Sequence, residues 1–292
     1  MASAYLAHED AQKVFADHRT VFAWGAGVQG QAIAVDGGFR VSGRWGFGSG
    51  SRHATWLGGQ APMKSASGVQ WLEPDGSPTY RTFIFPKTSC QVTNGWDVIG
   101  LRGTGSDTYE VSDLFVPDTH LFKRTVPAPH PSALYRTPLA TIYPISFASV
   151  ALGLARSILK SFTDMARTKA PQGLPPMRES AAVQSILGHA AIRLNSARTN
   201  LRVMIREIDG AVMDDEQAVR LRGITTFTTH ESLAVADVLF QEAGATAILV
   251  NQSFERRFRD IHAVAQQVQA RRQNFETVGK SLMGLETGPL FL

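Results

Sequence analysis

The spacing of apolar residues changes near residue 130, and this change constrains the fold more than any other feature of the chain. From residue 21 to residue 117, apolar side chains come in short alternating runs, such as Phe39, Val41 and Trp45, separated by turn residues. A period of two is typical of strands with one buried face. Asp36-Gly37 favours a tight hairpin, because both residue types tolerate positive φ. This part is therefore predicted to be an antiparallel β domain.

A cluster of prolines follows, and beyond it the spacing becomes that of helices. The prolines are Pro127, Pro129, Pro131, Pro138 and Pro144. They remove backbone donors too often for a helix or a central strand, so residues 126–144 are predicted to be a linker. Apolar residues then recur every three or four positions along one face: Val183, Leu187, Ala190, Leu194, Ala197, Leu201, Met204 and Ile208. With further helices expected over 145–168, 217–249 and 253–274, the pattern predicts a four-helix bundle and an α+β chain.

Composition excludes several classes of function. The chain has Lys+Arg 29 and Asp+Glu 25, a net charge of +4, with no run of five like charges that would mark a nucleic-acid surface. The single cysteine, Cys90, excludes an internal disulfide, and no metal site is expected because the histidines do not pair at metal-ligand spacing. No apolar run reaches the roughly 18 residues of a membrane span, and the N-terminus lacks the order of a signal peptide. We expect a cytoplasmic protein without a membrane or nucleic-acid partner.

Residues 42–53 form a loop of small residues with an aromatic frame. Glycines let a backbone approach a planar ligand closely, hydroxyls bond its polar edge, and Trp45 or Phe47 could cover one of its faces. A glycine-rich turn around a packed tryptophan explains the same residues equally simply. The loop by itself leaves both interpretations open.

Three longer blocks, in order along the chain, carry a family resemblance. They are VSGRWGFGSGSRHATWLGG at 41–59, WDVIGLRGTGSDTYEVSDLFVP at 96–117 and GATAILVNQSFERRFRDIHAVAQQ at 244–267. Together they resemble the acyl-CoA dehydrogenase fold, in the form used by flavin-dependent two-component monooxygenases that hydroxylate phenols and steroid rings or oxidise dibenzothiophene. The resemblance covers about residues 5 to 285.

The resemblance implies a fold of three parts, of which this chain has two. The family has an N-terminal helical domain, a middle antiparallel β domain and a C-terminal four-helix bundle that mediates a homotetramer. We expect a remnant of the first domain at 1–18, the β domain at 19–125, the linker at 126–144, the bundle at 145–285 and a tail at 286–292. On the order of a hundred residues of the N-terminal domain are absent compared with the family.

The resemblance also implies an activity. The hairpin ARTKAPQGLPPMRES at 166–180 resembles the monooxygenase branch, in which reduced FMN or FAD arrives from a separate flavin reductase. Oxygen then adds to the flavin and is transferred to a small aromatic or polycyclic substrate. An acyl-CoA dehydrogenase-like oxidoreductase and a catalytically silent oligomeric remnant stay open as alternatives, although the FAD-holding motif and glutamate of the dehydrogenases are not evident here.

Within the first block, the resemblance assigns roles to four residues. Such an enzyme must exclude water and hold the oxygenated flavin by hydrogen bonds. Ser49 and the amides of Phe47 and Gly48 are the candidates for those bonds, with Trp45 packed on the flavin. The alternative for Ser49 is a turn hydroxyl bonded to its own backbone.

Further candidates lie nearby in the sequence. His53 is expected to contact the substrate or the flavin, or else to be a strand-end histidine in solvent. Arg102 and Thr104 belong to a donor-rich loop, 102–106, that suits an anionic or carbonyl group, although a bulged turn explains its glycines equally well. His230, in an apolar helix, is expected to be a hydrogen-bonded core histidine.

Gln267 marks a departure from the resembled family. There the helix continues from Arg-Asp-x-His to a second histidine, which takes or shares the phenolic proton of the substrate. Gln267 stands at that position, and an amide cannot accept a proton at neutral pH. His262 is not expected to replace it, because five residues along a continuous helix turn a side chain by about 140°. We therefore expect either a substrate that needs no deprotonation, such as a thioether or an ionised phenol, or slow hydroxylation.

Overall fold

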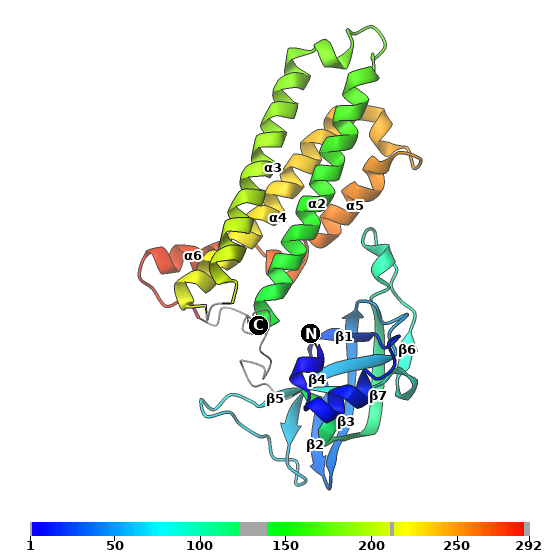
Figure 1. Ribbon diagram of the computed structural model, residues 1–292, viewed down its shortest axis with the longest axis vertical. Coiled ribbons are helices and arrows are strands. Elements are labelled where there is room, and N and C mark those ends of the chain that lie inside the picture. Colours follow the sequence, from blue (N-terminus) through cyan, green and yellow to red (C-terminus); the bar gives the residue numbers. More distant parts are fainter. Residues whose placement is uncertain (1, 123–138, 211–212, 289–292) are drawn as a thin grey trace. The chain divides into compact units, whose positions relative to one another are not determined.

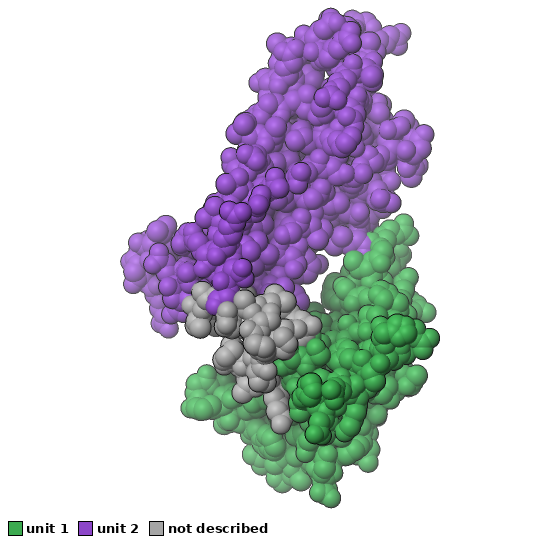
Figure 2. Space-filling model, in the orientation of Figure 1, with its two compact units in different colours: residues 1–98, 102–131 green, residues 99–101, 132–292 purple. Residues whose placement is uncertain are grey.

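The computed structural model describes residues 2–122, 139–210 and 213–288, and the chain divides into two compact units (Figures 1 and 2). The β unit comprises residues 1–98 and 102–131, and the helical unit comprises residues 99–101 and 132–292. Four of the five predicted linker prolines, those before Pro144, lie outside the described residues. Each unit is described on its own below.

The β unit is built on one twisted sheet. Its described strands are β1 (Phe22–Val28), β2 (Gln31–Val35), β3 (Gly38–Gly48), β4 (Trp56–Lys64), β5 (Tyr80–Pro86), β6 (Gln91–Thr93), β7 (Asp107–Pro117) and β8 (Leu121–Phe122). Their order is β6-β7-β3-β2-β4-β5-β8, with β1 paired to β4. The sheet confirms the α+β class but is mixed, because β4 runs parallel to both β1 and β2. Strand β3 is joined to β4 by the seven residues 49–55, and not by the tight turn that can join two neighbouring antiparallel strands.

The predicted hairpin at Asp36-Gly37 is confirmed. Val35 pairs with Gly38 across the two-residue turn, and Gly37 has a φ of 71°. Asp36, unlike Gly37, does not take positive φ. This turn fixes the register of β2 on β3, and hence the face of β3 that is buried.

Aromatic and aliphatic side chains of the strands form the core of the β unit. Its largest fully buried members are Trp45, Leu57, Phe83, Phe85 and Tyr109. The N-terminal segment, with a short helix α1 (His8–Val14), packs Leu6 and Val14 against Ile84 and Phe122.

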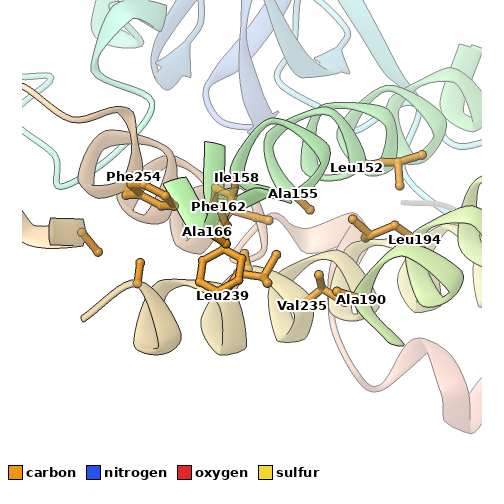
Figure 3. Close-up of a cluster of buried hydrophobic side chains, with 14 of the residues drawn as sticks. Leu152, Ala155, Ile158, Phe162, Ala166, Ala190, Leu194, Val235, Leu239 and Phe254 are labelled. Atoms are coloured by element: carbon orange, nitrogen blue, oxygen red, sulfur yellow. The ribbon is translucent and has the colours of Figure 1, made fainter. Parts of the chain in front are cut away.

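The helical unit is a bundle. Its helices are α2 (Leu139–Thr168), α3 (Ala181–Ile208), α4 (Asp215–Ala243), α5 (Ser253–Val264) and α6 (Asn274–Leu282), with α2, α3 and α4 lying along one another (Figure 1). Figure 3 shows its core, where Ile158 and Phe162 of α2 meet Val235 and Leu239 of α4. Ser180 caps α3 by accepting the amide of Val183, as the start of a helix requires.

Helix α2 begins earlier than predicted. Pro144 lies inside it, so the predicted linker extends too far along the chain. A proline in the first two turns removes only one intrahelical hydrogen bond, which a 30-residue helix tolerates.

The span from Thr141 to Thr168 in α2 is also long and apolar enough to cross a membrane by length and composition, with a mean hydropathy of 1.5. That corrects the expectation that no such run exists. Ala151, Ala155, Ile158 and Phe162 of this helix are buried in the core of the helical unit.

The predicted single helix over 253–274 is wrong. Helix α5 ends at Val264, a short 3-10 turn follows at Val268–Ala270, and α6 begins at Asn274. Side-chain hydrogen bonds hold the carbonyls of this 3-10 turn. The Nδ2 of Asn274 donates to the carbonyl of Gln269 at 2.9 Å, and His230 Nε2 lies 2.8 Å from the carbonyl of Ala270. The second contact confirms His230 as a hydrogen-bonded histidine.

Candidate functional site

Two loops meet at one edge of the sheet of the β unit. Strand β3 ends at Gly48 and β7 begins at Asp107, and these two residues are paired across the antiparallel ladder. The loop after β3, residues 48–53, therefore lies beside the loop before β7, residues 102–106. The sheet thereby brings together two segments that the sequence had offered separately as ligand loops.

Side-chain hydroxyls form a continuous chain between the loops. Ser49 Oγ lies 2.8 Å from Ser106 Oγ, which lies 2.7 Å from Thr104 Oγ1. The amide of Gly50 donates to the carbonyl of Thr104 at 2.8 Å, and Ser51 Oγ donates to the carbonyl of Gly105 at 3.1 Å. Every hydroxyl both donates and accepts, so this arrangement can hold or pass a hydrogen bond to a ligand placed at Ser49.

Phe47 is the aromatic side chain that the site exposes. Its backbone has a φ of 54°, a left-handed conformation that costs energy for a bulky residue, and its side chain is 67% exposed. Its ring packs edge-on against Trp96, with centroids 5.7 Å apart. Strained residues and exposed aromatic pairs concentrate at functional sites. Phe47, two residues before Ser49, and Trp96 thus form an apolar pair, called here the aromatic wall.

Trp45 does not occupy the predicted position on a flavin. Its side chain is fully buried, and its Nε1 donates to the carbonyl of Gln60 at 3.0 Å. Its ring packs between Phe85 and Tyr109, with centroids 5.9 and 6.0 Å away. Because every face of this ring is covered by the protein core, Trp45 is a packing residue.

An ion pair with one fully buried member joins the first loop to the start of β7, and sequence reasoning did not find it. Arg52 Nε donates to Asp107 Oδ2 at 2.7 Å and Arg52 Nη2 donates to Asp107 Oδ1 at 3.2 Å. The Asp107 side chain is fully buried, whereas that of Arg52 is half exposed. Its Oδ1 also accepts the amides of Gly95 and Trp96. The Arg52 hydrogen bond, opposed by burial and helped by these amides, holds the pKa of Asp107 below its usual range.

The lowered pKa predicts how Asp107→Asn changes stability with pH. A carboxylate whose pKa is lower in the folded state stabilises the fold fully above the unfolded pKa, which is about 3.9, and loses that contribution as pH falls through the lowered value. The difference in free energy of unfolding between wild type and Asp107→Asn should therefore stay constant from about pH 5 to 8 and shrink below about pH 4. Urea unfolding at several pH values measures it, and a difference that persists unchanged at about pH 3 contradicts the assignment.

The other predicted residues of the β unit are exposed on these loops. His53 follows Ser49 in the same loop and donates its amide to the carbonyl of Gly50. Arg102 begins the 3-10 turn Arg102–Thr104, with its side chain in solvent. Their roles as ligand contacts stay predictions.

Gln267 lies in the helical unit, in extended backbone between α5 and the following 3-10 turn. The expected 140° rotation from His262 assumed one continuous helix, and the end of α5 at Val264 removes that constraint. His262 Nε2 lies 2.9 Å from Asp237 Oδ1, and its ring packs on Phe258.

A concavity of about 710 Å³ in the β unit lies elsewhere and shares no residue with the two loops. The charged side chains that line it already have partners. Arg44 lies 3.7 Å from Glu110, and Lys64 donates to Gln31 at 3.1 Å. The two loops, with their strained aromatic and hydroxyl chain, are the better candidate.

Comparison with known proteins gives matches over both units. Residues 145–272 match the family described as acyl-CoA dehydrogenase, C-terminal domain. The oxygenase subunit HsaA of a flavin-dependent monooxygenase from Rhodococcus jostii (strain RHA1) is 28% identical over 259 residues, which cover 80% of this chain and 63% of that relative. The oxygenase component of an FADH(2)-dependent resorcinol hydroxylase from Rhizobium sp. (strain MTP-10005) is 25% identical, with 87% and 66% covered.

Among solved structures, XiaF from Streptomyces sp., in complex with FADH2 and glycerol, superposes with a TM-score of 0.88 at 23% identity. The match covers 100% of this chain and 76% of that one. At this identity the match establishes the fold. The chain spans less than two thirds of the length of the HsaA relative.

Proposed function

Since this chain belongs to the acyl-CoA dehydrogenase fold superfamily, with oxygenase subunits of flavin-dependent monooxygenases among its homologues, we propose that it is itself such an oxygenase component. It uses reduced FMN or FAD, supplied by a separate flavin reductase, to hydroxylate a small aromatic or polycyclic substrate. The observation that carries the proposal is the juxtaposition of the exposed, strained Phe47 with the hydroxyl chain that starts at Ser49.

The residues present fit a flavin. A flavin offers a flat apolar ring system with a polar edge, and it supplies the activation of oxygen when bound. Phe47 provides an exposed aromatic surface for the ring, and Ser49 provides a hydroxyl for the edge. A Cβ at Gly48 would approach the Tyr109 ring to 2.7 Å, so the backbone there accommodates no side chain. Gly48 therefore lets the end of β3 pack closely on the buried Tyr109 ring, directly beside Ser49.

Each residue of the chain has a task in this proposal. Ser49 holds the polar edge of the ligand, and Ser106 orients the Ser49 hydroxyl from a buried position, with 4% of its surface exposed. Phe47 and Trp96 keep water from the hydrogen bonds, which strengthens them. His53 and Arg102 are proposed as further contacts to the substrate or the flavin, from exposed positions on the same two loops.

We propose a cytoplasmic homo-oligomer, a tetramer by analogy with the resembled family. Exposed apolar side chains on the outer face of α3, Ile192 at 66% and Val203 at 45%, support association through the helical unit. Sedimentation at micromolar concentration tests this proposal, and a monomer contradicts it.

Anaerobic equilibrium dialysis with reduced and oxidised FMN and FAD tests the proposed function. The proposal expects the chain to bind one reduced flavin at least about tenfold more tightly than its oxidised form, a difference of about 1.4 kcal/mol. Tight binding of oxidised FAD would favour an acyl-CoA dehydrogenase-like oxidoreductase. Binding of neither form would favour a catalytically silent remnant.

Ser49→Ala is expected to weaken reduced-flavin binding only modestly. A neutral hydrogen bond contributes about 0.5–1.5 kcal/mol net, which corresponds to an increase of about twofold to tenfold in Kd. The same change should shorten the delay before hydrogen peroxide is released more than it weakens binding, because the Ser49 hydroxyl would hold the polar edge of the ligand. Ser67→Ala, which removes an exposed hydroxyl that bonds Ser65 away from these loops, is the matched control. Equal delays in wild type and Ser49→Ala would remove Ser49 from the site.

A further inference from the structure

Asp107 is the point at which three loops of the β unit meet. Through Arg52 it is bonded to the loop that carries Ser49, and through the amides of Gly95 and Trp96 it is bonded to the loop that carries Trp96 of the aromatic wall. As the first residue of β7, it also adjoins Ser106 in the third loop. Four hydrogen bonds thus converge on one fully buried carboxylate.

The stem of Arg52 adds a steric element to this arrangement. Gly105 has a φ of 51°, and a Cβ there would approach Arg52 Cδ to 2.8 Å. The side chain of Arg52 therefore lies directly over the loop that its guanidinium anchors. A bidentate pair fixes both the distance and the orientation of its two partners. The Arg52–Asp107 pair thus fixes how the loop of Ser49 lies against the loop of Ser106.

We propose that Asp107 is the positioning residue that holds Trp96 against Phe47 and Ser106 against Ser49, so that the flavin site exists before the ligand arrives. Two arms act separately: the Arg52 arm aligns the hydroxyl chain, and the amide arm aligns the aromatic wall. This inference rests on the proposed function, because it attributes part of the affinity for reduced flavin to the alignment of these loops. Preorganisation of this kind raises affinity by removing the cost of ordering the loops on binding.

The two arms are separated by substitution. Asp107→Ala removes both. Asp107→Asn keeps an oxygen that can accept the amides of Gly95 and Trp96 but loses the ion pair with Arg52. Arg52→Gln removes the same ion pair by changing the arginine. Asp113→Asn is the matched surface control, because Asp113 pairs with Arg40 away from these loops. Val116→Ala is the stability control, since Val116 is buried at the other end of β7.

Two measurements are made on every variant: the Kd for reduced flavin under anaerobic conditions, and hydrogen exchange of the 94–98 segment by mass spectrometry. Asp107→Ala should raise the Kd at least about tenfold and speed exchange at Gly95 and Trp96 by a similar factor. Asp107→Asn and Arg52→Gln should each raise the Kd about threefold with slow exchange retained, and their double variant should be no worse than either. Both controls should keep the wild-type Kd and slow exchange at 94–98.

Several outcomes overturn the inference. It is wrong if Asp107→Ala binds reduced flavin within about twofold of wild type, or if Val116→Ala weakens binding as much at equal loss of stability. If Asp107→Ala does not fold, the Kd values of Asp107→Asn, Arg52→Gln and their double variant decide instead. Losses of affinity that add up in the double variant contradict the inference that the two residues act through one ion pair. Wild-type protein that binds no reduced flavin refutes the proposed function instead. Hydrogen exchange at 94–98 then tests the positioning role of Asp107 alone, and equal exchange at Gly95 and Trp96 in wild type and Asp107→Ala contradicts it.

Discussion

Trp45→Ala is expected to destabilise the β unit by about 3–5 kcal/mol, because removing a buried tryptophan leaves a cavity that the sheet cannot close. The Trp45 ring is fully buried between Phe85 and Tyr109, and its Nε1 bonds the carbonyl of Gln60. The substitution thus also leaves that carbonyl without its partner, which adds to the loss. Urea unfolding followed by circular dichroism measures the change.

Two controls separate packing from ligand contact. Trp71→Ala removes the same side chain from a position that is 39% exposed and should cost much less stability. Phe47→Ala, at 67% exposure, should leave the free energy of unfolding within about 0.5 kcal/mol of wild type while weakening reduced-flavin binding. A stable Trp45→Ala variant with impaired flavin binding would restore Trp45 as a ligand contact and contradict the structure.

Gln267→His is expected to raise coupled hydroxylation of phenols by about 10²-fold, the lower end of what a positioned general base contributes. A neutral imidazole accepts the phenolic proton, which the Gln267 amide cannot do. Because α5 ends at Val264, the backbone at position 267 is extended, and the new side chain is not tied to the direction of a helix. Product formation per flavin oxidised, measured over a pH range, reports the gain.

Gln266→His is the control for this gain. It places the same imidazole one residue away, at an exposed position, and should leave coupling unchanged. The pH profile of Gln267→His should acquire an ionisation near the usual histidine pKa, about 6.5. If coupling is unchanged in Gln267→His while reduced flavin still reacts with oxygen, the proposed correspondence of Gln267 to a catalytic base is wrong.

Helix α3 shows how far periodicity alone reaches. Seven of its eight predicted face residues are buried, and the eighth, Leu187, is half-buried. The pattern succeeds because it extends over many turns of one helix and depends on no distant partner. The same reasoning fails for 253–274, where α5 ends at Val264 without a proline or glycine, and side chains from α4 and α6 bond the carbonyls of the 3-10 turn that follows.

Strand β3 shows where alternation and family resemblance conflict. Phe39, Val41 and Trp45 share one parity, which predicts that Trp45 joins the core, and the structure agrees. The same parity would bury Phe47, but its left-handed backbone turns that side chain outward. Only the flanking glycines hint at such a reversal. The positive φ of a phenylalanine is imposed by the surrounding fold.

The Arg52–Asp107 pair is beyond local sequence reasoning altogether. Its members are 55 positions apart, with Arg52 in a loop and Asp107 at the first residue of β7. Their meeting depends on the register of β3 against β7, in which Gly48 pairs with Asp107. That register follows from long-range pairing of strands, whose partners the chain sequence does not specify locally.

Rapid mixing of the protein, loaded with reduced flavin, with oxygenated buffer tests the central claim most directly. The absorbance of oxidised flavin and the release of hydrogen peroxide are followed together. An oxygenase that excludes water should show a transient absorbance before oxidised flavin appears, with peroxide release delayed by at least about tenfold relative to free flavin. Phe47→Ala should shorten that delay. Oxidised flavin and peroxide that appear together, at the rate of free reduced flavin, would contradict the account.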